Sequence, residues 1–241
     1  ELKLPKKLGS TQKKQSGNGL SKAATVGMED GIQYRILLYN TSTNKFERSE
    51  IATSGTALEI DVYKGQEYEW YAYSYNTADH IEAPDINNPQ VMSKTDSPLL
   101  YASGRVTATD IGSTPIHINF QHQLAQIKVE VDTRAVYGDI HDLTAVFNAN
   151  YIKTGSFNIR SGAFEGSLTD VAVGELNFIT ADINNNRVKV AKYYTADVLL
   201  NAYQVKFNKL DIKLPNGAIA SLASKFPNGG MTTFDNYVGS S

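Results

Sequence analysis

Apolar and polar residues alternate with a period of two along most of the chain beyond residue 33. A typical stretch has Leu58, Ile60 and Val62 alternating with Glu59 and Asp61. This period is typical of antiparallel strands with one buried and one solvated face. No segment of eleven or more residues keeps the spacing of an amphipathic helix. The pattern therefore predicts an all-β protein.

Turn-forming residues separate the candidate strands. Pro215-Asn216-Gly217, between Leu214 and Ala218, predicts a hairpin. A short helical turn is expected at most over residues 85–94. Many short strands separated by such turns favour a sandwich-like architecture.

The parity of the inward-facing positions changes once along the chain. Apolar positions are even-numbered up to Leu124 and odd-numbered from Ile127. A single strand cannot change parity without a bulge or a break. We therefore place a strong bend or domain boundary at Ala125–Gln126, which divides the ordered chain into an N-terminal domain, 28–125, and a C-terminal domain, 126–241.

The first 27 residues differ from the rest in charge. They carry six lysines and one acidic residue, within a chain whose net charge is −2. No apolar residue lies between Gly9 and Gly19. Such a segment buries too little surface to offset its ordering entropy. We expect residues 1–27 to be a flexible basic leader.

Composition excludes several classes of function. The absence of cysteine among 241 residues excludes disulfides, thiolate nucleophiles and iron–sulfur sites. The net charge gives no field that would favour nucleic acid. No apolar run approaches the 18 residues of a transmembrane helix. His117 and His122 fall on opposite faces of one predicted strand, so they cannot jointly bind a metal. We interpret His122 as a hydrogen-bonded core histidine.

Motifs that imitate known sites lack essential parts. Asp182–Asn186 begins like a calcium loop, but Arg187 stands where that loop needs glycine, so we interpret a polar turn. The order of motifs in penicillin-recognising serine enzymes is imitated by Ser10-x-x-Lys13, Ser74-Tyr-Asn76 and Lys153-Thr-Gly155. Ser10, however, lies in a polar stretch that should not form a helix. No convergent acid, base and nucleophile are visible. We expect a protein that is not an enzyme and needs no metal or cofactor.

Aromatic residues are densest over residues 68–75. Trp70 shares its parity with Tyr68, which places it in the core. The opposite face would carry Tyr71, Tyr73 and Tyr75. Ordinary cross-strand packing explains these tyrosines, and so does a binding face for sugar rings or a protein partner.

Four segments together resemble the fimbrillin family, the pilus subunits and adhesins of anaerobic oral and gut bacteria. These segments are Gln33–Tyr39, Glu69–Asn76, Ser97–Gly104 and Ile116–Val129. The third contains the family's Leu-Leu-Tyr-Ala element, preceded here by Ser-Pro in place of an acidic residue. The fourth contains Phe-x-His-x-Leu-Ala-x-Ile-x-Val, the strand that enters the family's second domain. The resemblance covers about residues 30–215.

The resemblance implies two tandem antiparallel β-sandwich domains of transthyretin-like topology. It also implies a pilus subunit or adhesin at the cell surface, either fimbrial or held to the outer membrane as a lipoprotein through an N-terminal cysteine that this chain lacks. Polymerising members of the family lose an N-terminal strand to a trypsin-like protease. The groove then accepts a strand from the next subunit by β-augmentation.

Carried over to this chain, the resemblance gives candidate residues for each step. The candidate processing sites are Lys22, Arg35 and Arg48. The candidate strand-exchange region is the first ordered strand, with Tyr34, Ile36 and Leu38. Other pilus subunits are the expected partners, followed by a host or bacterial surface protein or glycan. The alternative function is a surface carbohydrate-binding module that uses the three tyrosines at 71, 73 and 75.

Overall fold

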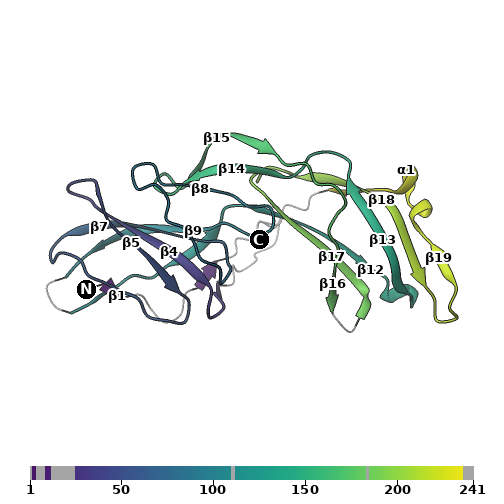
Figure 1. Ribbon diagram of the computed structural model, residues 1–241, viewed down its shortest axis with the longest axis horizontal. Coiled ribbons are helices and arrows are strands. Elements are labelled where there is room, and N and C mark those ends of the chain that lie inside the picture. The colour runs from purple at the N-terminus through teal and green to yellow at the C-terminus, as the bar shows by residue number, and fades with distance from the viewer. Residues whose placement is uncertain (1, 4–8, 12–24, 110–111, 183–184, 236–241) are drawn as a thin grey trace, which may run out of the picture. The chain divides into compact units, whose positions relative to one another are not determined.

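The computed structural model describes residues 2–3, 9–11, 25–109, 112–182 and 185–235 (Figure 1). Regular structure in these residues is almost entirely β, as the alternation predicts. Helical structure in the described residues comprises two 3-10 turns, Arg134–Val136 and Ala223–Lys225, and the four-residue α1, Pro227–Gly230. The helical turn expected over residues 85–94 is wrong, because this segment bends at residues 86–88 and then forms strand β8.

The chain forms two compact units. One comprises residues 1–124 and 155–167, and the other comprises residues 125–154 and 168–239, in their described parts. The strands of the first unit are β1 (Leu2–Lys3), β2 (Gly9–Thr11), β3 (Thr25–Gly27), β4 (Gln33–Asn40), β5 (Lys45–Thr53), β6 (Glu59–Ile60), β7 (Glu67–Ser74), β8 (Gln90–Met92), β9 (Leu100–Thr107), β10 (Thr114–Pro115) and β11 (Asn119–His122). Most of β14 (Lys153–Asn158) and β15 (Ala163–Asp170) also belongs to this unit.

The described residues of the first unit form three sheets. The largest has the order β3-β2-β11-β9-β7-β4-β5, and two smaller ones have the orders β10-β1-β6 and β15-β14-β8. Pairing is antiparallel within β4, β5, β7 and β9, whereas β1 and β2 run parallel to β10 and β11 respectively. The turn after β4 is closed locally, because the Asn40 side chain accepts hydrogen bonds from the backbone N–H groups of Ser42 and Thr43.

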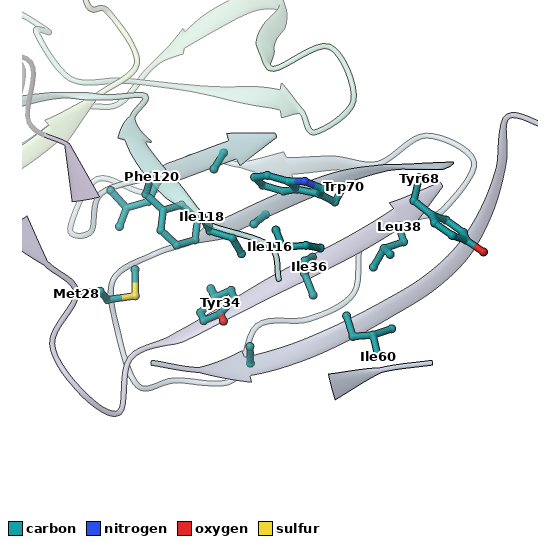
Figure 2. Packing of buried hydrophobic residues seen from close by; sticks show 14 of the residues in the cluster. Met28, Tyr34, Ile36, Leu38, Ile60, Tyr68, Trp70, Ile116, Ile118 and Phe120 are labelled. Atoms are coloured by element: carbon teal, nitrogen blue, oxygen red, sulfur yellow. The ribbon is translucent and has the colours of Figure 1, made fainter. Parts of the chain in front are cut away.

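The core of the first unit collects even-numbered side chains, as the parity predicts. Tyr34, Ile36 and Leu38 of β4 lie with Tyr68 and Trp70 of β7 in one buried cluster (Figure 2). Facing residues come from β6 and from residues 116–120. The core position expected for Trp70 is confirmed.

The expectation of one solvated face is wrong for β4 and β7. On the odd-numbered face, Leu37, Tyr39, Tyr71 and Tyr73 are buried as well. The segment after β7 and the β14–β15 hairpin supply buried residues on this side, among them Ile81 and the residues Phe157 and Ile159. The central sheet of the first unit is thus covered on both faces.

The second unit contains two further sheets, in the orders β12-β17-β16 and β13-β18-β19, with β20 also paired to β18. Its strands are β12 (Ala125–Asp132), β13 (Asp139–Phe147), β16 (Ile179–Asp182), β17 (Asn185–Thr195), β18 (Ala202–Lys213), β19 (Ile219–Ser221) and β20 (Met231–Asp235). The predicted hairpin is confirmed: β18 pairs with β19, and the Leu214 N–H donates to the Ala218 carbonyl at 2.9 Å. Asp182 pairs with Asn185, and the two residues between them lie outside the described residues, so the polar turn predicted there stays a prediction.

The change of parity coincides with a break between strands. β11 ends at His122 in a sheet of the first unit, and β12 begins at Ala125 and pairs with β17 of the second. Residues 155–167 group with the first unit although they lie far beyond this break. The division into independent domains 28–125 and 126–241, their tandem arrangement and the transthyretin-like topology stay predictions. The leader expected over residues 1–27 lies largely outside the described residues.

Gly104 provides a test of the packing around Trp70. A Cβ at Gly104, opposite Trp70 in the β7–β9 ladder, would lie 2.6 Å from the indole Cζ2. Because Trp70 is buried, it cannot move away freely. We expect Gly104→Ala to lower the free energy of unfolding by about 1–3 kcal/mol in urea denaturation. Gly174→Ala, whose Cβ meets nothing within 4 Å, is the control. Equal stabilities for the two variants would contradict the packing.

Candidate functional site

The three candidate binding tyrosines lie on the outer face of β7 and just beyond its end. Tyr73 is fully buried, Tyr71 is 8% exposed, and Tyr75 is half-buried. The Tyr73 hydroxyl donates to the Glu82 carbonyl and the Tyr75 hydroxyl to the Met92 carbonyl, each at 2.9 Å. In the described conformation, only Tyr75 has substantial exposed surface. A binding role for the three stays a prediction.

An irregular segment, residues 77–94, covers this tyrosine face. Side chains of the sheet hold it by its backbone carbonyls. The Arg35 guanidinium donates to the Ile81 carbonyl through Nε and Nη2, at 3.1 and 2.5 Å. Arg35 also donates through Nη1 to Ser49 Oγ at 2.9 Å, and the Tyr39 hydroxyl donates to the Ile86 carbonyl at 3.1 Å. Donors from the sheet thus take the place of a regular backbone ladder over much of this segment.

The β14–β15 hairpin covers the rest of the face. Phe157 is fully buried and packs edge-on against Tyr101, with ring centroids 5.2 Å apart. The Tyr101 hydroxyl donates to the Ile159 carbonyl at 2.9 Å. β14 also pairs with β8, so the two covering segments are joined by backbone hydrogen bonds. The cover is therefore an integral layer of the first unit.

A charged cluster lies on the same face. Glu69 accepts hydrogen bonds from the Tyr71 hydroxyl at 2.9 Å and from Arg105 at 2.7 Å. These hydrogen bonds hold the pKa of the Glu69 carboxyl below its usual value. Arg160 of the hairpin lies 3.9 Å from Glu69, and its guanidinium stacks over the Tyr39 ring at 4.6 Å. The cluster ties the tip of the hairpin to the sheet.

Sequence reasoning missed this cover, although β4 carried a signal for it. Leu37 and Tyr39 are apolar at the odd positions that a solvated face would fill with polar residues. Arg35, on the same face, is only 7% exposed. An apolar outer face with one charged residue is typical of a sheet buried on both sides around a hydrogen-bonded cation.

The candidate processing sites occupy very different environments. Arg35 is buried in β4, which pairs with β5 on one side and with β7 on the other. Arg48 has an exposed side chain on the edge strand β5. Lys22 lies outside the described residues, between β2 and β3 in sequence. Cleavage at each site stays a prediction.

The candidate strand-exchange residues Tyr34, Ile36 and Leu38 are buried in β4. Because β5 and β7 flank β4, both of its edges are occupied by strands of the same chain. The N-terminal segment provides other candidate positions for strand exchange. β1 is the middle strand between β10 and β6, where Leu2 pairs with both Thr114 and Ile60. β2 likewise lies between β11 and β3.

His122 is half-buried and His117 is exposed. Burial lowers the pKa of the His122 imidazole.

No group of three or more potential metal ligands occurs among the described residues. Within them, no helix is long and apolar enough to span a membrane.

Comparison with known proteins gives the family. Residues 19–231 match the fimbrillin-like family, so the chain belongs to that family. No curated protein matches the sequence. The match covers all four segments whose sequence resembles fimbrillins.

Solved structures of low identity are similar to the chain over most of its length. The fimbrial anchor protein Mfa2 from Porphyromonas gingivalis is 12% identical, with 91% of this chain and 82% of that chain covered and a TM-score of 0.40. A candidate cell adhesion protein from Bacteroides fragilis is 16% identical, with 89% and 82% covered and a TM-score of 0.46. A fimbrial assembly protein from Parabacteroides distasonis is 10% identical, with 95% and 88% covered and a TM-score of 0.32. The family assignment rests on the sequence match.

Arg35 gives a test of how the cover is held. Arg35→Met removes the donors to the Ile81 carbonyl, and an unsatisfied buried carbonyl costs about 1–3 kcal/mol. We expect amide hydrogen exchange of residues 77–88 to become roughly 5–150-fold faster. Arg48→Met, on the neighbouring strand with an exposed side chain, is the control and should leave this exchange unchanged. Unchanged exchange in Arg35→Met would show that the cover is held by other contacts.

His122 should make stability depend on pH. Because its pKa is lower in the folded than in the unfolded state, the unfolded state binds more protons. The contribution of His122 to the free energy of unfolding is complete above about pH 7. It is lost as the pH falls below about 6.5 toward the lowered pKa of the folded state. Urea denaturation at several pH values should show a smaller loss of stability for His122→Gln than for the wild type. Identical pH profiles for the wild type and His122→Gln would refute the assignment.

Proposed function

We propose that the chain is a cell-surface pilus subunit or adhesin that assembles by protease-triggered strand exchange. The family supports the general role, because fimbrillin-like proteins are structural. The observation that supports the mechanism is the position of β1 as the middle strand of a three-stranded sheet. Removing a middle strand leaves two strands that each lack a partner on one side. Such a slot is suited to β-augmentation by a strand of another subunit.

The short N-terminal strands make few backbone hydrogen bonds, which favours their exchange for a longer donor strand. β1 contributes two residues to its sheet and β2 contributes three to the other. Each backbone hydrogen bond adds about 0.5–1.5 kcal/mol. A donor strand of ordinary length, about 5–6 residues, would make more hydrogen bonds than β1 does if it extended the pairing beyond the two-residue strands β6 and β10. Such a donor strand would be held more firmly than the segment it replaces.

Lys22 is the processing site that this arrangement favours. Cleavage there would separate β1 and β2 from the rest of the chain and leave β3 in place. Cleavage at Arg35 would cut through β4, which lies between β5 and β7, and the Arg35 side chain is buried. Cleavage at Arg48 would leave β3 and β4 on the released fragment.

Anchoring to the outer membrane as a lipoprotein and binding to host or bacterial surface groups remain implications of the resemblance.

Limited trypsin digestion followed by electrophoresis without boiling tests this mechanism. We expect one early cut at Lys22, identified by mass spectrometry, and then a ladder of detergent-resistant multimers. A variant with Lys13, Lys14 and Lys22 all replaced by alanine should abolish both the cut and the ladder, because these three lysines lie between β2 and β3, whereas Arg48→Ala should change neither. A clean cut that leaves only monomer would contradict strand exchange. In that case a glycan array with wild type and Tyr75→Ala would test the carbohydrate-binding alternative.

A further inference from the structure

The slot that β1 fills between β6 and β10 has two chemically different faces. Ile60 of β6 is only 3% exposed and belongs to the core cluster of the first unit (Figure 2). Its neighbour Glu59 is exposed, and so is Pro115 of β10. Successive positions of a strand lie on opposite faces of a sheet. A strand in this slot therefore presents alternate residues to the core and to solvent.

The register of β1 assigns its two positions to these faces. Position 2 is paired with Ile60 and Thr114, and position 3 is paired with Glu59 and Pro115. Because paired positions share a face, position 2 lies on the core face and position 3 on the outer face. The sequence has leucine at position 2 and lysine at position 3. The chain's own occupant of the slot is thus an apolar residue followed by a basic one.

The carboxylate of Glu59 sets the charge that the outer position accepts. Opposite charges directly across a ladder stabilise it, and like charges destabilise it. Asp61, two residues further on and also exposed, adds a second carboxylate next to β6. On the other side of the slot, Pro115 has no charge and no backbone N–H, so β10 discriminates little between donor strands. The outer position therefore favours a basic residue.

The charge of the whole N-terminal segment follows the same pattern. Residues 1–27 carry six lysines and one acidic residue, whereas the rest of the chain has more acidic than basic residues. Attraction between segments of opposite charge speeds their encounter and disfavours partners of the wrong charge. A basic donor strand would therefore be favoured both before and after it enters the slot.

We propose that the slot selects a donor strand with an apolar residue paired with Ile60 and a basic residue paired with Glu59. This inference rests on the strand exchange proposed above and adds the chemistry of the partner, a strand of another pilus subunit that carries this apolar–basic pair. An acidic residue at the outer position would place two carboxylates directly opposite each other. A charged residue at the core-facing position would be buried among apolar side chains.

Peptide binding to the cleaved chain tests the selection at Glu59. After cleavage at Lys22, the trypsin is inactivated, the released fragment is separated, and a labelled peptide of residues 1–11 is added. In fluorescence anisotropy, we expect the same peptide with Lys3→Glu to bind about 2–30-fold more weakly. The preference should reverse in Glu59→Lys and disappear in Glu59→Gln.

Two controls separate this pairing from other effects. Asp79→Lys changes the charge of the first unit by the same amount at an exposed position outside the slot, so it should keep the wild-type preference between the two peptides. A peptide with Leu2→Asp should bind at least about tenfold more weakly than the unchanged peptide, because it would bury a carboxylate.

The outcomes distinguish this inference from the strand exchange on which it rests. If no peptide binds the cleaved chain, the slot accepts no strand, and strand exchange and the selection both fail. If the unchanged and Lys3→Glu peptides bind equally well, or if Glu59→Lys keeps the wild-type preference, strand exchange stands and the selection at Glu59 fails. A preference that is also lost in Asp79→Lys would show that net charge decides, which would overturn the selection as well.

Discussion

Burial of the central sheet on both faces is the constraint on which the first unit depends. The even-numbered side chains of β4 and β7 form one core, and the odd-numbered ones require a second layer. Each fully buried large side chain contributes about 1.5–3 kcal/mol, so a layer that seals several of them is strongly favoured. The protein supplies this layer from an irregular segment and from a hairpin encoded in the second half of the chain. The hairpin makes the first unit discontinuous in sequence.

This constraint changes how the aromatic strand is understood. A row of tyrosines on an exposed strand is a natural platform for sugars, but here the Tyr73 and Tyr75 hydroxyls donate to carbonyls of the covering segment. Tyr73 and Tyr101 each donate to a backbone carbonyl of the cover, and Arg35 donates twice to another. Every residue has a backbone carbonyl, so these hydrogen bonds place no demand on the side chain at that position. They hold residues 77–94 although most of this segment has no regular secondary structure. The amphipathic character of tyrosine, apolar ring and polar hydroxyl, suits this task.

Alternation predicted the all-β fold, the buried face of β4 and the core position of Trp70, because a period of two is a local property of the chain. The parity change near Ala125 likewise located a break between strands. The second covering layer could not be predicted in the same way. It depends on residues 155–167 reaching a sheet formed by residues 33–107, a contact that no local pattern encodes. The place of β1 between β6 and β10 is also non-local, and its two residues carry no detectable period.

In the proposed mechanism, the N-terminal segment fills strand positions that a strand of another subunit takes after cleavage. Amide hydrogen exchange of β6 and of Thr114, which flank β1, tests this mechanism most directly. We predict protected amides in the intact chain, fast exchange in the monomer after cleavage at Lys22, and restored protection in the assembled multimer. If the amides of β6 and Thr114 stay equally protected when residues 1–22 are removed, β1 does not occupy a slot that strand exchange could use.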